Sequence, residues 1–98
     1  MPHKSVLLEE VIAGLALKHG SIVVDGTVGA GGHAKVICEK IGNAGKLICL
    51  DQDPTSLAKA KKILENSNNT SLYHENFVNI KKILDRLNIP AVDAVILD

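Results

Sequence analysis

The segment 22–34 constrains the fold of this 98-residue chain more than any other stretch. It opens with Ile-Val-Val, three β-branched residues that favour a buried strand, and Asp25 follows them. Glycines then recur at positions 26, 29, 31 and 32. Because glycine has no Cβ, such a loop can turn sharply and lie close to a ligand. A helix that begins near Gly32 would direct its first N–H groups at an anionic group. The segment therefore predicts a strand–loop–helix cradle for a nucleotide-like ligand.

The spacing of the glycines distinguishes between nucleotide ligands. Gly29, Gly31 and Ala34 fit the dinucleotide pattern G-x-G-x-x-G/A, whereas no Gly-Lys-Ser/Thr follows to complete a P-loop. Asp25 favours S-adenosyl-L-methionine, because a carboxylate there would repel a pyrophosphate but suits an ammonium and a sulfonium. The pattern Asp-x-x-x-Gly-x-Gly resembles the first motif of the class I methyltransferases. The alternative is that Asp25 only caps the turn.

Composition indicates one small domain. The chain is 46% hydrophobic with a formal net charge of zero, and it has no run of about 18 apolar residues that would span a membrane. Its N-terminus lacks the pattern of a signal peptide. Cys38 and Cys49 have no metal-ligand spacing, so we expect reduced core thiols in a cytoplasmic protein and no metal site.

The charge distribution gives no sign of a nucleic-acid surface. A phosphate-binding surface usually has a basic excess, whereas this chain is neutral and only 2% aromatic. Lys59, Lys61 and Lys62 are interpreted as a solvated helix face. If the protein acts on RNA, most residues that hold the RNA lie outside these 98.

The order of predicted elements specifies an α/β fold. Helices are expected from Ser5 to Gly20, 32–41, from the cap Asp53 and Pro54 to 64, and 77–87, and strands at 22–25, 47–50, 71–74 and 92–97. This alternation with short links requires a parallel sheet with helices on both faces, and we predict the strand order 3-2-1-4. The fourth strand would be an apolar edge, so we expect the sheet to continue beyond residue 98 in the natural protein. We also expect the 98-residue chain by itself to associate through this strand.

Polar and aromatic residues follow the carboxyl ends of these strands, where open α/β sheets bind ligands. Asp51 comes 20 residues after Gly31, a position from which an acid can accept both hydroxyls of an adenosine ribose; the alternative is a solvated loop acid. Phe77 either stacks on an adenine or plugs the start of the fourth helix. Asp98 ends the fourth strand.

With these residues in place, the whole chain resembles the bacterial ribosomal small-subunit RNA methyltransferase H family, also called MraW. The likeness rests above all on Asp-Gly-Thr-x-Gly-Ala-Gly-Gly-His, which begins at Asp25 and is far more specific than a bare glycine loop. The other matching stretches are His3–Val11, Asp51–Pro54, Asn76–Phe77 and Val92–Asp98.

The resemblance implies an enzyme that methylates the N4 amino group of a cytosine in 16S rRNA, in the small ribosomal subunit, with S-adenosyl-L-methionine as the donor. It implies a Rossmann-like class I methyltransferase fold, of which residues 1–98 are the N-terminal part. Gly31, Gly32 and His33 would contact the methionine end and Asp51 the ribose. Phe77 would contact the adenine and Asp98 would lie by the methyl-donor pocket, while the catalytic residue stays unnamed.

Two other classes of protein remain open from the residues alone. The pattern Gly29-x-Gly31-x-x-Ala34 is compatible with a fragment of a nicotinamide-dependent oxidoreductase. A non-catalytic α/β domain, in which glycines and acids serve only the turns, is the third reading. Binding of NAD without S-adenosyl-L-methionine or S-adenosylhomocysteine would favour the oxidoreductase, and a folded, longer protein that binds no nucleoside would favour the non-catalytic domain. We expect the 98-residue chain alone to be inactive on rRNA and to bind cofactor weakly if at all.

Overall fold

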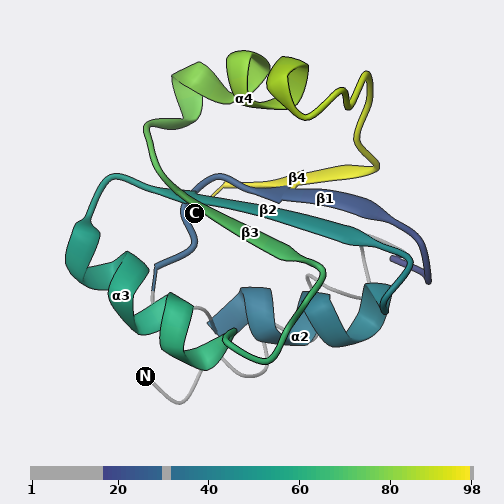
Figure 1. Cartoon of the computed structure of the whole chain (residues 1–98), viewed down its shortest axis with the longest axis horizontal. Coiled ribbons are helices and arrows are strands. Elements are labelled where there is room, and N and C mark those ends of the chain that lie inside the picture. The colour runs from purple at the N-terminus through teal and green to yellow at the C-terminus, as the bar shows by residue number, and fades with distance from the viewer. Residues whose placement is uncertain (1–16, 30–31, 98) are drawn as a thin grey trace.

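The computed structural model describes residues 17–29 and 32–97, which form a parallel sheet between two helical layers (Figure 1). The strands are β1 (Ile22–Asp25), β2 (Lys46–Asp51), β3 (Thr70–His74) and β4 (Ala94–Ile96), and they lie in the order β3-β2-β1-β4. All pairings in this sheet are parallel. The predicted strand order and fold class are thus confirmed. Nearly all of the helix predicted from Ser5 lies outside the described residues.

Helices cover both faces of the sheet. The helices α2 (Gly32–Ile41) and α3 (Pro54–Ile63) pack on one face, and the 3-10 turn η1 (Phe77–Asn79) and α4 (Ile80–Arg86) pack on the other (Figure 1). Alternate residues of the central strands separate into these two layers, as a period of two requires. On the α2 side lie Val23, Leu47 and Cys49, and on the α4 side lie Val24, Ile48 and Leu50.

The boundary of α3 follows the predicted capping chemistry. Asp53 is the N-cap, and its Oδ1 accepts a hydrogen bond of 2.9 Å from the backbone N–H of Thr55. Pro54 occupies the first helical position, where its missing N–H costs nothing. The hydrogen bond from Thr55 lowers the pKa of the Asp53 carboxyl below its usual value. Asp53 is therefore a structural acid, as its position predicts.

Two elements begin later than their sequence pattern predicts. The fourth helix starts as η1, because Asn76 Oδ1 accepts from the backbone N–H of Val78 at 3.0 Å and caps a tighter turn. The fourth strand is only three residues long rather than 92–97. Asp93 explains its start, because its carboxylate and its N–H bond the N–H and C=O of Ile22, both at 2.7 Å.

Both cysteines are free, buried thiols, as predicted. Burial, and then the neighbouring Asp25 carboxylate, raise the pKa of Cys49 far above its usual value, so this thiol stays protonated and inert. Cys38 Sγ lies 2.6 Å from Thr70 Oγ1 and 3.1 Å from Asn69 Oδ1. Within the described part of the chain, no helix is long and apolar enough to cross a membrane.

Candidate functional site

Backbone hydrogen bonds tie the loops together at the carboxyl edge of the sheet. Beyond β1, Gly26 N–H donates to Ile96 O and Val28 N–H donates to Leu50 O, both at 2.8 Å. Glu75 N–H, just beyond β3, donates to Asp51 O at 3.0 Å. The chain segments that follow β1 and β3 are therefore held against the ends of β2 and β4. This edge is the place where the sequence predicts a ligand site.

Asp51 stands at the centre of this edge. Its Oδ2 accepts a hydrogen bond from the backbone N–H of Gly29 at 2.9 Å, and its Oδ1 accepts from the N–H of Asp53 at 2.9 Å. The side chain is half-buried. A carboxylate oxygen can accept more than one hydrogen bond, so both oxygens keep capacity for a ligand hydroxyl. Asp51 is thus oriented by the protein before any ligand binds.

The glycine loop presents an open surface beside Asp51. Gly29 has a φ of +57°, a left-handed conformation that glycine adopts without strain. A Cβ added at Gly29 or at Gly32 would meet no other atom within 4 Å. Open space therefore lies over both ends of the loop, next to the first turn of α2. Gly31, between them, lies outside the described residues.

Asp25 lies beneath the loop rather than on its surface. Its side chain is only 1% exposed, and Oδ1 accepts from the backbone N–H of Thr27 at 3.2 Å. In the sheet its Cα pairs with Cys49. The turn-capping role that the sequence left open is therefore present, whereas contact between Asp25 and a ligand stays a prediction.

Phe77 belongs both to the core and to the edge. It packs with the hydrophobic cluster under α4, as expected of a residue that plugs the start of a helix. A Cβ built on Gly26 would stand 2.8 Å from Phe77 Cδ1 and would also clash with the Leu97 side chain. The Phe77 ring consequently lies directly on the turn after β1. The two predicted roles of Phe77 are compatible with one another.

Of the remaining predicted site residues, only His33 lies within the described part of the chain. His33 is half-buried in the first turn of α2. Asp98, like Gly31, lies outside the described residues. The roles assigned to these three residues remain predictions. Sequence reasoning missed the bond between Asp51 and Gly29, for which no local spacing rule exists because it joins residues 22 positions apart.

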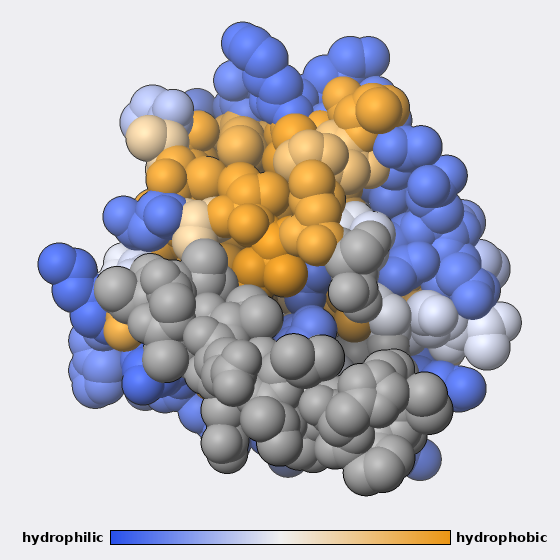
Figure 2. Space-filling view, turned by 180° about the vertical axis from the view of Figure 1, so that it is seen from behind, coloured by the Kyte–Doolittle hydropathy of each residue, from blue (hydrophilic) through white to orange (hydrophobic). Residues whose placement is uncertain are grey.

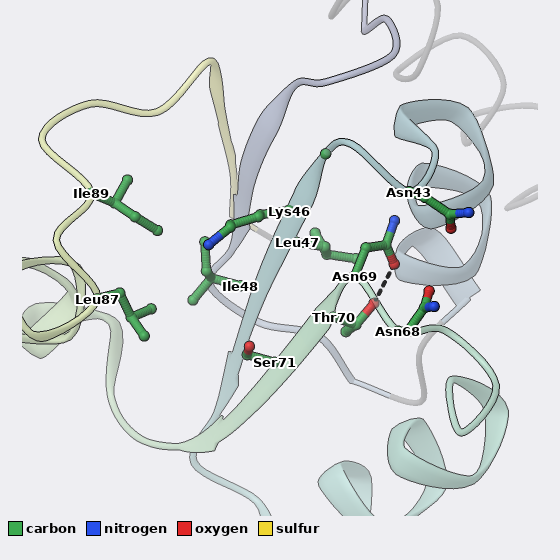
Figure 3. Close-up of a pocket in the computed structure, with 11 residues that line it drawn as sticks. Asn43, Lys46, Leu47, Ile48, Asn68, Asn69, Thr70, Ser71, Leu87 and Ile89 are labelled. Carbon is green, nitrogen blue, oxygen red and sulfur yellow. Dashed lines mark hydrogen bonds between the residues drawn. The ribbon is translucent and has the colours of Figure 1, made fainter.

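The pocket shown in Figure 3 lies at the other end of the strands from the glycine loop. It has a volume of about 230 Å³ and opens beside the amino ends of β2 and β3, where Lys46 and Ser71 lie. Leu87 and Ile89, from the segment after α4, close its other side (Figure 3). Asp51 ends the strand that Lys46 begins, so this pocket is separate from the glycine loop.

The fold is that of a Rossmann-like methyltransferase, and comparison with known proteins agrees. The model of the MraW methylase family matches residues 1–98, so the chain belongs to that family. Ribosomal RNA small subunit methyltransferase H of Clostridium botulinum is 46% identical over 96 residues, which cover 98% of this chain and 31% of that protein. The chain thus spans about a third of the length of the curated relatives it matches.

Solved structures share the fold. A putative rRNA methylase from Clostridium thermocellum superimposes with a TM-score of 0.72 and 27% identity, over 81% of this chain and 42% of its own. Fibrillarin of Aeropyrum pernix, solved with natively bound S-adenosyl-L-methionine, has a TM-score of 0.71 over 83% of this chain and 34% of its own. At 16% identity the second likeness concerns the fold alone.

Proposed function

We propose that this chain is the cofactor-binding part of an enzyme that transfers a methyl group from S-adenosyl-L-methionine to the N4 amino group of a cytosine in 16S rRNA. Membership of the MraW methylase family supports the proposal, as does the name of the relatives that are 46% identical. The bond between Asp51 and Gly29 is the single structural observation that carries it.

The bond between Asp51 and Gly29 limits which ligand the glycine loop can hold. A dinucleotide pyrophosphate needs the N–H groups of the glycine loop, but Gly29 N–H is already donated to Asp51 Oδ2 at 2.9 Å. An acid at the position of Asp51 also binds the ribose of a dinucleotide, so its charge alone does not distinguish the two ligands. Asp25, buried beneath the same turn, does distinguish them, because its carboxylate would repel a phosphate placed on the loop. S-adenosyl-L-methionine has no phosphate and carries two positive groups, so it fits this environment.

Each residue of the edge then has a distinct task. Asp51 accepts the ribose hydroxyls, and Phe77 contacts the adenine. Gly31, Gly32 and His33 hold the methionine end. Asp98 borders the methyl-donor pocket. Asp25 acts from below, because its burial leaves it to fix the turn and to place negative charge under the positive end of the ligand.

The contribution of this chain to the reaction is binding and alignment. When bound, S-adenosyl-L-methionine would supply a methyl group on a positively charged sulfur: the N4 nitrogen would bond the methyl carbon as the carbon–sulfur bond breaks, the sulfur would leave as the neutral thioether of S-adenosylhomocysteine, and the amino group would release one proton. Asp51 and the glycine loop would hold the donor in one orientation, so that the methyl carbon faces the incoming base. The base must be unpaired or flipped to reach it.

We propose that most of the RNA-binding surface lies outside these 98 residues. The chain spans 31% of the length of its relatives and carries no net charge, whereas RNA binding relies on basic surface. The 98-residue chain alone should therefore not methylate small ribosomal subunits. Tritium transfer from labelled S-adenosyl-L-methionine measures this directly, and turnover above background would contradict it.

A titration tests the choice of cofactor. The natural-length protein should bind S-adenosylhomocysteine, the reaction product, and should show no heat of binding with NAD. The opposite result would support the oxidoreductase reading of Gly29, Gly31 and Ala34. A folded protein that binds neither compound would support a non-catalytic domain.

We also propose that the 98-residue chain self-associates through β4. Figure 2 shows a continuous apolar area on the side of the molecule where β4 forms the edge of the sheet. Val95 within β4 is 43% exposed and Leu97 just after it is 58% exposed. An open apolar edge favours pairing with a second copy, which would bury these side chains.

Sedimentation of the chain should show dimers that increase with concentration. Val95→Lys should keep it monomeric, because a charged side chain on an edge strand opposes pairing. Ile63→Lys is the matched control, since Ile63 is also 43% exposed but lies on α3. A wild-type chain that stays monomeric at high concentration would contradict edge pairing, and so would equal effects of the two substitutions.

A further inference from the structure

A hydrogen bond between the side chains of Glu75 and Asn79, called the clasp below, joins the two ends of η1. Glu75 Oε1 accepts a hydrogen bond from Asn79 Nδ2 at 2.7 Å and a longer one from the backbone N–H of Asn76 at 3.3 Å. Glu75 precedes η1 and Asn79 is its last residue, so the side-chain bond spans the whole turn. Phe77 begins that turn.

This clasp is not required to start the turn. Asn76 already caps η1 through the bond from Val78 N–H to its Oδ1, and Asn79 N–H donates to Asn76 O at 3.0 Å. The bond between Glu75 and Asn79 is an additional restraint between the two ends of the turn. It limits how the turn can rotate or unwind, and therefore where the Phe77 side chain can lie.

Glu75 also links this turn to the ribose-binding acid. Its backbone N–H donates to the C=O of Asp51 at 3.0 Å, so the residue that fixes η1 is itself fixed to the end of β2. On the other side, the Phe77 ring is held against Gly26, where a Cβ would stand 2.8 Å from Cδ1. One short segment thus sets the position of Phe77 relative to Asp51.

We infer that Glu75 is a positioning residue for the cofactor, which acts through its bond to Asn79 to hold Phe77 at the distance from Asp51 that the adenosine needs. The inference rests on the proposed function, because it assumes that Phe77 faces the adenine and Asp51 the ribose. It assigns Glu75 no contact with the cofactor and no part in the chemistry.

Calorimetry with S-adenosylhomocysteine on the natural-length protein tests the role of the clasp. Glu75→Ala should weaken binding about three- to tenfold, the effect of losing one charge-assisted hydrogen bond that orders a binding residue. Glu75→Gln should restore most of the affinity, because its amide oxygen can still accept from Asn79. Glu65→Ala, which removes an exposed acid beyond α3, is the matched control and should bind as the wild type does.

A double-mutant cycle tests whether Glu75 acts through Phe77. In a Phe77→Leu background, Glu75→Ala should have little further effect on affinity, whereas its effect should add to that of Asp51→Ala. Asn79→Ala should reproduce Glu75→Ala and replaces it in the cycle if the latter does not fold. Equal affinity of Glu75→Ala and the wild type, or full additivity with Phe77→Leu, would overturn the inference. A wild-type protein that does not bind S-adenosylhomocysteine would overturn the proposed function itself.

Discussion

Asp51→Ala should weaken the binding of S-adenosylhomocysteine to the natural-length protein about 5- to 150-fold, or roughly 1–3 kcal/mol. Two of the interactions lost in this variant affect binding. The ribose hydroxyls lose a charged acceptor, and Gly29 N–H loses the carboxylate that holds the loop against β2. Calorimetry measures the affinity, and thermal unfolding without ligand measures the stability. We expect the affinity to fall much further than the stability, because the half-buried site lets water replace the lost acceptor.

Asp53→Ala is the matched control for this experiment. Asp53 lies two residues away, is fully exposed and serves as the N-cap of α3. Its loss should lower the free energy of unfolding, as for other N-caps, without a tenfold loss of affinity. An unchanged affinity in Asp51→Ala, or equal losses of affinity in both variants, would remove Asp51 from the proposed binding site.

The sequence was sufficient for the topology because the strongest signals act locally. β-branched and apolar runs specify the central strands, and capping chemistry specifies where α3 begins, with Asp53 before Pro54. Once short helices alternate with strands, handedness and chain connectivity leave few arrangements of a parallel sheet. The order β3-β2-β1-β4 follows from those constraints.

The contacts within the site depend on tertiary structure and were not predictable in the same way. Asp51 could be placed beside the glycine loop, because both follow parallel strands. Its bond to Gly29 could not, since it depends on how the loop folds back over β2. The clasp between Glu75 and Asn79 was missed because the sequence pattern predicts a regular helix from Phe77, whereas the chain forms a 3-10 turn there that brings these two side chains together.

The edge strand β4 shows how a polar side chain can shorten a strand that an apolar pattern predicts. Residues 92–97 look like a six-residue strand, but Asp93 bonds the N–H of Ile22 through its carboxylate and β4 begins only after it. The carboxyl end of β4 is defined by the bond from Gly26 to Ile96. The same bond anchors the turn on which Phe77 lies, so the end of β4 helps to build the site.

Gly45→Ala should cause the largest loss of stability among substitutions of the described glycines. A Cβ on Gly45 would lie 2.7 Å from the backbone oxygen of Ser21 and 2.7 Å from Ile41 Cβ. The Ser21 oxygen accepts the N–H of Lys46 at 3.0 Å, the hydrogen bond that starts the pairing of β1 with β2. Because neither neighbour is the end of a flexible side chain, the backbone itself must shift. We expect the free energy of unfolding to fall by about 1–3 kcal/mol or more, as for other overpacked sites.

Urea unfolding measures this loss, and Gly32→Ala is the control, because a Cβ there meets no other atom within 4 Å. Equal unfolding midpoints of the two variants would contradict the steric argument.

Gly45→Ala should also affect the site at the far end of β2. In the wild type, Lys46 pairs with Ile22 and Cys49 with Asp25, and this register brings Asp51 to Gly29. If the start of β2 is displaced, the bond between Asp51 and Gly29 is strained as well. Gly45→Ala should therefore weaken the binding of S-adenosylhomocysteine although no part of Gly45 lies near the proposed cofactor site.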